Sequence, residues 1–145
     1  MNPASQAFSV SALVDVKAEE AFAFLADGMN QRYWALGSWD RRQLEEDLFA
    51  GNSLFDGSEL LIRVVPRRDL LLVDFLTGTK PEALDHHVEA RVIPGPTLGH
   101  APGRCLVVLT VFRDATADAE LWTRLRHVFE TEIHMIKGRL EIGFR

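Results

Sequence analysis

Apolar residues recur at every second position near the start of the chain, from Phe8 to Val16. Serine or aspartate occupies most positions in between, and Leu13 is the exception. This period of two is typical of a strand that buries one face. From Ala18 to Ala26 the residues change to helix formers, with glutamates in the first turn and Asp27-Gly28 where a C-terminal cap belongs. We therefore predict a strand followed directly by a short helix.

The stretch from residue 29 to residue 57 carries turn and loop signals. Residues 29–34 are compatible with one further helical turn, and residues 41–47 form a charged connection. The dipeptides Gly51-Asn52 and Asp56-Gly57 suit backbone with positive φ. They predict tight turns, with short hairpin strands on either side of residues 51–52.

Four later segments are apolar or alternate between apolar and polar residues. They cover residues 60–64, 70–76, 86–92 and 105–112. Proline, glycine and charged residues separate them, most densely in residues 94–103. This spacing predicts about six strands in antiparallel hairpins after the short helices.

The clearest pattern lies near the C-terminal end. At 3.6 residues per turn, large apolar side chains fall on one face and polar ones on the other. The apolar face consists of Trp122, Leu125, Phe129, Ile133, Ile136 and Leu140. His127 and His134 lie on the polar face, and Asp118, or Thr116 just before it, is a suitable N-cap. We predict a long amphipathic helix of more than about five turns.

These elements together predict the fold class. A sheet with one apolar face must be covered, and the terminal helix is long and apolar enough to lie across it. The chain shows no repeat and no linker, and its 145 residues suit one domain. We therefore predict an α+β two-layer architecture with residues 1–145 as a single domain.

Charge and composition argue against several classes of function. Lys and Arg number 16 against 21 Asp and Glu, for a net charge of −5, and no concentrated basic face is apparent. Nucleic-acid partners are therefore not expected. No run reaches the roughly 18 apolar residues of a transmembrane segment, and the N-terminus does not look like a secretory signal. Cys105 is the single cysteine, which favours a reducing, cytoplasmic location.

The order of elements resembles the Bet v 1-like or START-like superfamily, also called SRPBCC. The resemblance rests on residues 16–27 after the first strand, on residues 122–140 at the end, and on the strands between them. It implies a helix-grip fold, in which a curved antiparallel sheet grips the C-terminal helix around a cavity. Such proteins include lipid and hormone carriers, polyketide cyclases and aromatases, Hsp90-ATPase-activator-like proteins and many uncharacterised bacterial members. No motif specific to one subfamily is present, so no catalytic residue transfers.

Histidines are the first candidates for chemistry. His86 and His87 stand side by side, and neighbours on a strand point to opposite faces. If Val88 faces the cavity, His86 does so too and is a candidate acid or base; a solvated histidine at the strand end is the alternative. No cluster of residues has the spacing of a metal site, so no metal and no cofactor are expected.

Other candidate cavity residues come from the aromatic cluster and the terminal helix. The full set is Tyr33, Trp34, Trp39, Phe75, His86, Val88, Trp122, Leu125, Phe129 and Ile133. Tyr33, Trp34 and Trp39 suit a pocket rim, with packing under a loop as the alternative. Asp74 interrupts an apolar strand, where it borders an interface, serves as a cavity polar group, or is simply exposed.

Three functions follow from this picture. The first is the binding of a small apolar or amphipathic molecule, such as a lipid, a polyketide, an aromatic metabolite or a quinone. The second is a cyclase or aromatase, for which at least two ionisable side chains must converge in the cavity. The third is a protein-interaction domain, which predicts a filled interior and an exposed apolar patch. A homodimer is expected as well, because residues 70–73 and 105–109 are apolar on both faces.

Overall fold

The computed structural model describes residues 5–143, which form seven strands, two α-helices and three short 3-10 helices. The strands are β1 (Ala7–Val14), β2 (Trp39–Gln43), β3 (Leu48–Asn52), β4 (Glu59–Arg67), β5 (Leu72–Gly78), β6 (Asp85–Pro94) and β7 (Cys105–Phe112). The helices are α1 (Ala18–Ala26), η1 (Gly28–Tyr33), η2 (Arg68–Leu70), η3 (Gly95–Leu98) and α2 (Ala119–Ile142).

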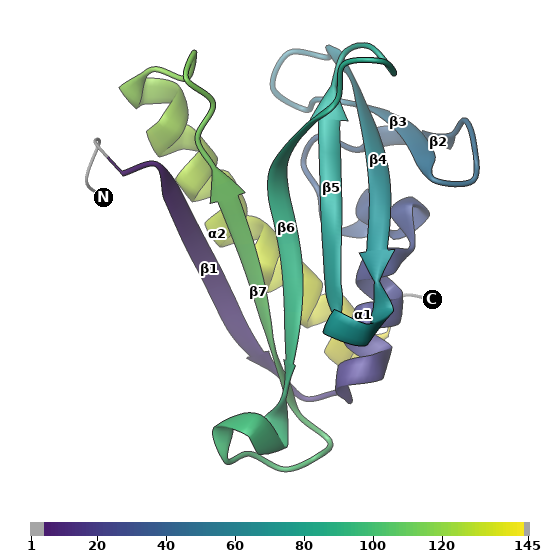
Figure 1. Ribbon diagram of the computed structural model, residues 1–145, viewed down its shortest axis with the longest axis vertical. Coiled ribbons are helices and arrows are strands. Elements are labelled where there is room, and N and C mark those ends of the chain that lie inside the picture. Colours follow the sequence, from purple (N-terminus) through teal and green to yellow (C-terminus); the bar gives the residue numbers. More distant parts are fainter. Residues whose placement is uncertain (1–4, 144–145) are drawn as a thin grey trace.

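All seven strands belong to one antiparallel sheet in the order β1-β7-β6-β5-β4-β3-β2. Consecutive strands from β2 to β7 are neighbours, as hairpin connections require, and β1 joins at the edge beside β7. Figure 1 shows α2 running diagonally behind β1, β7 and β6, with α1 behind the lower ends of β4 and β5. The α+β helix-grip fold is therefore confirmed.

The terminal helix begins and turns as its sequence predicts. Asp118 is the N-cap, and its Oδ1 accepts a hydrogen bond from the backbone N–H of Leu121 at 2.8 Å. The side chains of Trp122, Ile133 and Ile136 are buried against the sheet. His127 and His134 are exposed on the opposite side. The 3.6-residue period thus decides which face of α2 meets the sheet.

Two local predictions are wrong, and both concern residues 39–58. Gly51-Asn52 is not a turn but the end of β3, where Asn52 pairs with Glu59 and the chain reverses over residues 53–58. The predicted charged connection overlaps the second half of β2, which pairs with β3. The charged residues of β2 do not show the apolar alternation typical of a strand. One of them, Arg42, forms ion pairs at the sheet surface instead.

The core lies between the sheet and the two α-helices. Val14, Val73, Val107 and Leu109 from the inner face of the sheet are fully buried there. The outer face is different, since the apolar side chains of Leu72, Leu76, Leu106 and Val108 remain only half-buried on it. A partner copy that covers this face stays a prediction. None of the helices in residues 5–143 has the length and apolar character needed to cross a membrane.

Candidate functional site

A cavity of about 370 Å³ lies between the inner face of the sheet and the N-terminal half of α2. Most of its lining is apolar and comes from four strands and the helix. Representative wall residues are Ile62, Phe75, Val88, Val111, Leu125 and Phe129. A cavity of this size and character suits a small organic molecule.

Strand register and helix period explain why these side chains meet. Phe75 pairs with Val88, and Val88 pairs with Val111, so the three side chains form one row across β5, β6 and β7. Because paired residues share a face, the whole row points at the helix. Leu125 and Phe129 are one helical turn apart and face this row from α2.

The predicted cavity residues divide into two groups. Trp34, Phe75, Val88, Leu125 and Phe129 line the cavity. Trp122 and Ile133 are instead packed in the core, where the Trp122 ring lies 4.9 Å from the ring of Phe8. Tyr33 is half-buried beneath the guanidinium of Arg139, and Trp39 is 62% exposed on β2. The last four therefore lie outside the lining.

His86 also lies outside the cavity, and His87 takes its place. The register of β5 and β6 shifts between Phe75 and Leu76, so that Phe75 faces Val88 but Leu76 faces His86. His87 is the extra residue of this bulge, and simple alternation breaks down there. His86 and Val88 consequently point to opposite faces of the sheet, which corrects the prediction that both face inward.

His87 contacts Asp114 at the edge of the cavity. Its Nε2 lies 3.2 Å from Oδ2 of Asp114, and both residues belong to the lining. The hydroxyl and backbone N–H of Thr116 donate hydrogen bonds to Asp114 and lower the pKa of its carboxyl. Asp114 therefore stays ionised and can orient the His87 ring.

Glu132 is a functional candidate that the sequence patterns missed. It is only 4% exposed, lines the cavity, and accepts a hydrogen bond at Oε2 from the backbone N–H of Leu36 at 2.8 Å. Burial raises the pKa of its carboxyl to about 8, against the opposing effect of that hydrogen bond. The group is thus largely protonated at pH 7 and able to donate a proton or a hydrogen bond. Its position seven residues after Leu125, beside the apolar arc of the helix, was the available signal.

Two further polar atoms close to this region have no hydrogen-bond partner within residues 5–143. They are Oε1 of Gln31 and Nε1 of Trp34, both buried and both on residues that line the cavity. Buried polar atoms are rarely left unpaired. These two atoms and the Glu132 carboxyl lie at the end of the cavity beside η1, which we call the polar end.

The mouth of the cavity is spanned by one contact between distant segments. The guanidinium carbon of Arg124 on α2 lies 4.8 Å from the ring centre of Phe55, in the β3–β4 connection. Both residues belong to the lining, and Phe55 is 54% exposed. A cation–π contact of this kind closes the mouth loosely, because both side chains are free to move into solvent.

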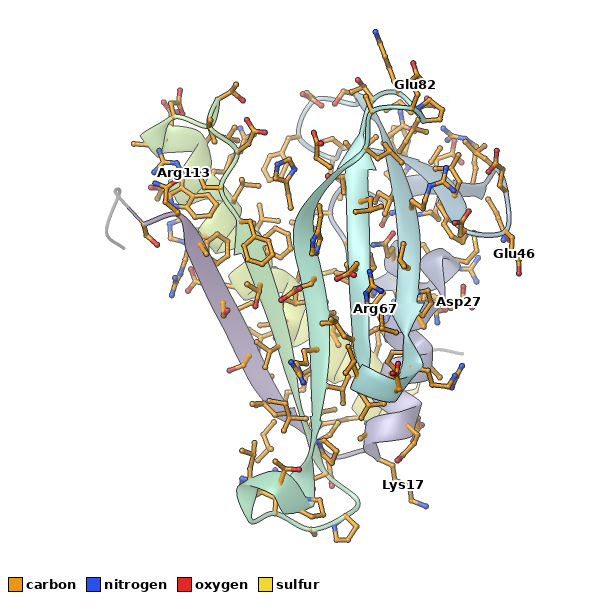
Figure 2. The ribbon with its side chains drawn as sticks, in the orientation of Figure 1. Lys17, Asp27, Glu46, Arg67, Glu82 and Arg113 are labelled. Carbon is orange, nitrogen blue, oxygen red and sulfur yellow. The ribbon has the colours of Figure 1, made fainter. Side chains whose placement is uncertain are left out.

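Asp74 lies on the outer face of the sheet, away from the cavity. Its carboxylate contacts Nε of Arg67 at 2.6 Å and Nε2 of His86 at 3.2 Å, which explains how it is buried on an exposed face. Figure 2 shows Arg67 on the face of the sheet that is turned away from α2. Ligand atoms of Asp74, His86 and Glu89 lie within 4.8 Å of one another, and the Asp74 carboxylate is already paired with the Arg67 guanidinium.

Comparison with known proteins identifies the fold. No protein-family model matches the sequence, and no curated protein matches it. Among solved structures, the Zhui aromatase/cyclase from a Streptomyces species has a TM-score of 0.70 at 15% identity, over 93% of each chain. A START superfamily protein from Mycobacterium smegmatis has a TM-score of 0.66 at 12% identity, over 95% of this chain and 99% of that one.

A third similar structure is the di-domain ARO/CYC protein BexL. Its TM-score is 0.72 at 14% identity, and the match covers 94% of this chain but 47% of BexL. Identities this low establish a shared fold and leave ligand and reaction open. The chain therefore shares its helix-grip fold with these two aromatase/cyclase structures and with the START superfamily protein.

Proposed function

We propose that this protein binds a small, mainly apolar molecule in the cavity between the sheet and α2. The observation that carries the proposal is the cavity itself, about 370 Å³ of mainly apolar space between the sheet and the terminal helix. Apolar walls with a few polar groups among them are the usual character of a small-molecule site. A protein-interaction domain would instead be expected to have a filled interior.

The ligand class follows from the lining. Phe75, Phe129 and Trp34 offer ring faces and edges, which suit an aromatic metabolite, a quinone or a polyketide as well as a lipid chain. Similarity to aromatase/cyclases and to a START protein supports the same range. The polar end at Glu132 favours a ligand with at least one oxygen at one end.

The test is binding of an apolar fluorescent probe, with mass spectrometry of small molecules released when the gently purified protein is denatured. Val88→Phe places a larger side chain in the cavity and should weaken probe binding at least about tenfold. Val108→Phe is the matched control, because Val108 lies half-buried on the outer face of the neighbouring strand. Equal probe affinity in both variants would contradict a site in this cavity.

Catalysis of the cyclase or aromatase type is the second candidate. It requires at least two ionisable side chains in the cavity, and His87, Asp114 and Glu132 all belong to the lining. A protonated Glu132 can polarise a ligand carbonyl, while His87 held by Asp114 can accept a proton. The discriminating experiment is turnover of a poly-β-ketone substrate by the wild-type protein and by Glu132→Gln.

A further inference from the structure

Arg41 is buried on the inner side of β2. It is 8% exposed, and within residues 5–143 none of its three guanidinium nitrogens has a hydrogen-bond partner. Arg42, its neighbour, points to the outer face and is paired with Asp40 at 2.9 Å and with Glu59 at 2.7 Å. Of these two adjacent arginines, Arg42 is therefore ion-paired on the outer face, whereas Arg41 is buried and its guanidinium has no hydrogen-bond partner within residues 5–143.

Strand β2 has a bulge next to Arg41. Trp39 pairs with Asn52 and Arg42 pairs with Ala50, so that Asp40 and Arg41 together face Gly51. The extra residue, Asp40, has a φ of 54°, in the left-handed region. Arg41 and Arg42 point to opposite faces, as neighbouring residues on a strand do, and the bulge shifts the register between Trp39 and Arg42.

Gly51 leaves room for the guanidinium of Arg41. A Cβ at Gly51 would lie 3.2 Å from Nη1 of Arg41 and 3.0 Å from the carbonyl oxygen of Gly37, so the guanidinium occupies the space above Gly51. Gly51 pairs with Leu60, and both Leu60 and Gly37 line the cavity. Arg41 itself is not part of the lining, but its guanidinium lies behind these wall residues, at the end beside η1.

The polar groups at this end are mostly hydrogen-bond donors. The guanidinium of Arg41 has five N–H groups, the indole of Trp34 has one, and the protonated carboxyl of Glu132 adds another. Gln31 supplies an acceptor. A buried cation without a counter-charge is strongly unfavourable, and a planar guanidinium matches the two oxygens of a carboxylate.

We propose that the ligand carries a carboxylate, which Arg41 binds at the polar end of the cavity while the apolar body lies between Phe75 and Phe129. This inference rests on the proposed small-molecule binding and names the chemistry of the head group. The flexible Arg41 side chain turns from Gly51 towards the cavity to meet the anion. The bound carboxylate then provides a negative charge for the Arg41 guanidinium, which has no hydrogen-bond partner within residues 5–143.

Three ligands with the same naphthalene body and different head groups test the proposal. They are 2-naphthoate, 2-naphthalenemethanol and 2-naphthylmethylammonium, each titrated calorimetrically into the full chain at pH 7. We expect 2-naphthoate to bind at least about tenfold more tightly than the alcohol. The ammonium ligand should bind more weakly than the alcohol, because Arg41 repels it.

Variants of the two neighbouring arginines show which charge matters. Arg41→Met should weaken 2-naphthoate at least about tenfold and leave the alcohol within about twofold, whereas Arg41→Lys should retain part of the preference for the anion. Arg42→Met is the matched control and should leave all three affinities within about twofold. Circular dichroism checks the fold of each variant. If Arg41→Met does not fold, the wild-type ligand series and Arg41→Lys still decide the matter.

The outcomes distinguish failure of the carboxylate proposal from failure of the proposed small-molecule binding. If the alcohol binds wild type as tightly as 2-naphthoate, or if Arg42→Met reduces the preference as much as Arg41→Met, the carboxylate proposal is overturned while small-molecule binding stands. If none of the three ligands binds and an apolar fluorescent probe does not bind either, the proposed function itself fails. Preference for the ammonium ligand would assign the polar end to Glu132 as a counter-ion instead.

Discussion

The carboxyl of Glu132 and the backbone N–H of Leu36 are joined by a hydrogen bond of 2.8 Å. The two residues are 96 positions apart, one on α2 and the other in the segment between η1 and β2. Both line the cavity, so this contact connects the helix to the polar end of the site. It also satisfies one oxygen of a carboxyl group that is almost wholly removed from solvent.

Stability should depend on pH through Glu132. Its pKa is about 8 in the folded protein and near 4.5 when exposed, so the unfolded chain binds fewer protons between these values. The contribution of the Glu132 carboxyl to the free energy of unfolding is therefore fully present below about pH 4.5. It is lost as the pH rises towards 8, by up to about 1.4 kcal/mol per pH unit. Urea unfolding of the wild-type protein at pH 5, 6, 7 and 8 measures this loss.

Glu132→Gln is the matched control for that experiment. The amide oxygen of Gln can still accept the hydrogen bond from Leu36, but the side chain does not ionise. The variant should therefore lose less stability than the wild-type protein between pH 5 and pH 8. The same slope in both proteins would show that Glu132 is not the group responsible.

Phe129→Ala should separate a cavity wall from a packed core. Truncating a buried aromatic in a packed interior costs about 3–5 kcal/mol. Phe129 borders space that already exists, so we expect a loss near 3 kcal/mol or below, with probe affinity changed at least about fivefold. A loss of about 4 kcal/mol with unaltered affinity would contradict its role in the site. Ile136→Ala, in the core away from the cavity, should cost about 2–5 kcal/mol and leave affinity unchanged.

Phe55→Ala should change the rates of ligand exchange more than the affinity. The contact between Phe55 and Arg124 spans the mouth of the cavity and is worth about 0.5–1 kcal/mol at an exposed site. Removing the ring should raise both association and dissociation rates about two- to fivefold. Stopped-flow fluorescence of an apolar probe measures both rates. Leu54→Ala is the control, because Leu54 is 61% exposed and lies outside the lining.

His86→Ala and His87→Ala form a pair that tests the strand bulge. His86 lies on the outer face, so its replacement should leave probe affinity within about twofold. His87→Ala removes a side chain from the lining and should change the affinity by more than that. If a substrate is found, loss of turnover by about a hundredfold in His87→Ala alone would mark a general acid or base. Such a loss in His86→Ala would contradict this placement.

The sequence by itself determined the larger elements, because their periods report local geometry. Alternation predicted the strands around Phe75 and Val88, and the 3.6-residue period predicted which residues of α2 face the sheet, including Phe129. Asp118 marked the start of that helix by its capping chemistry. Each of these signals involves residues close together along the chain.

Only the tertiary structure decided the polar features of the cavity. The bulge at His87 depends on how β6 pairs with β5, and the bulge at Arg41 depends on Gly51 in the neighbouring strand. A single extra residue reverses every side chain beyond it, so the sequence pattern assigned His86 to the wrong face. Glu132 acquires its raised pKa from burial in the folded protein, and its hydrogen-bond partner Leu36 lies far away along the chain. Burial and register arise from pairing between distant segments, which no local pattern of residues contains.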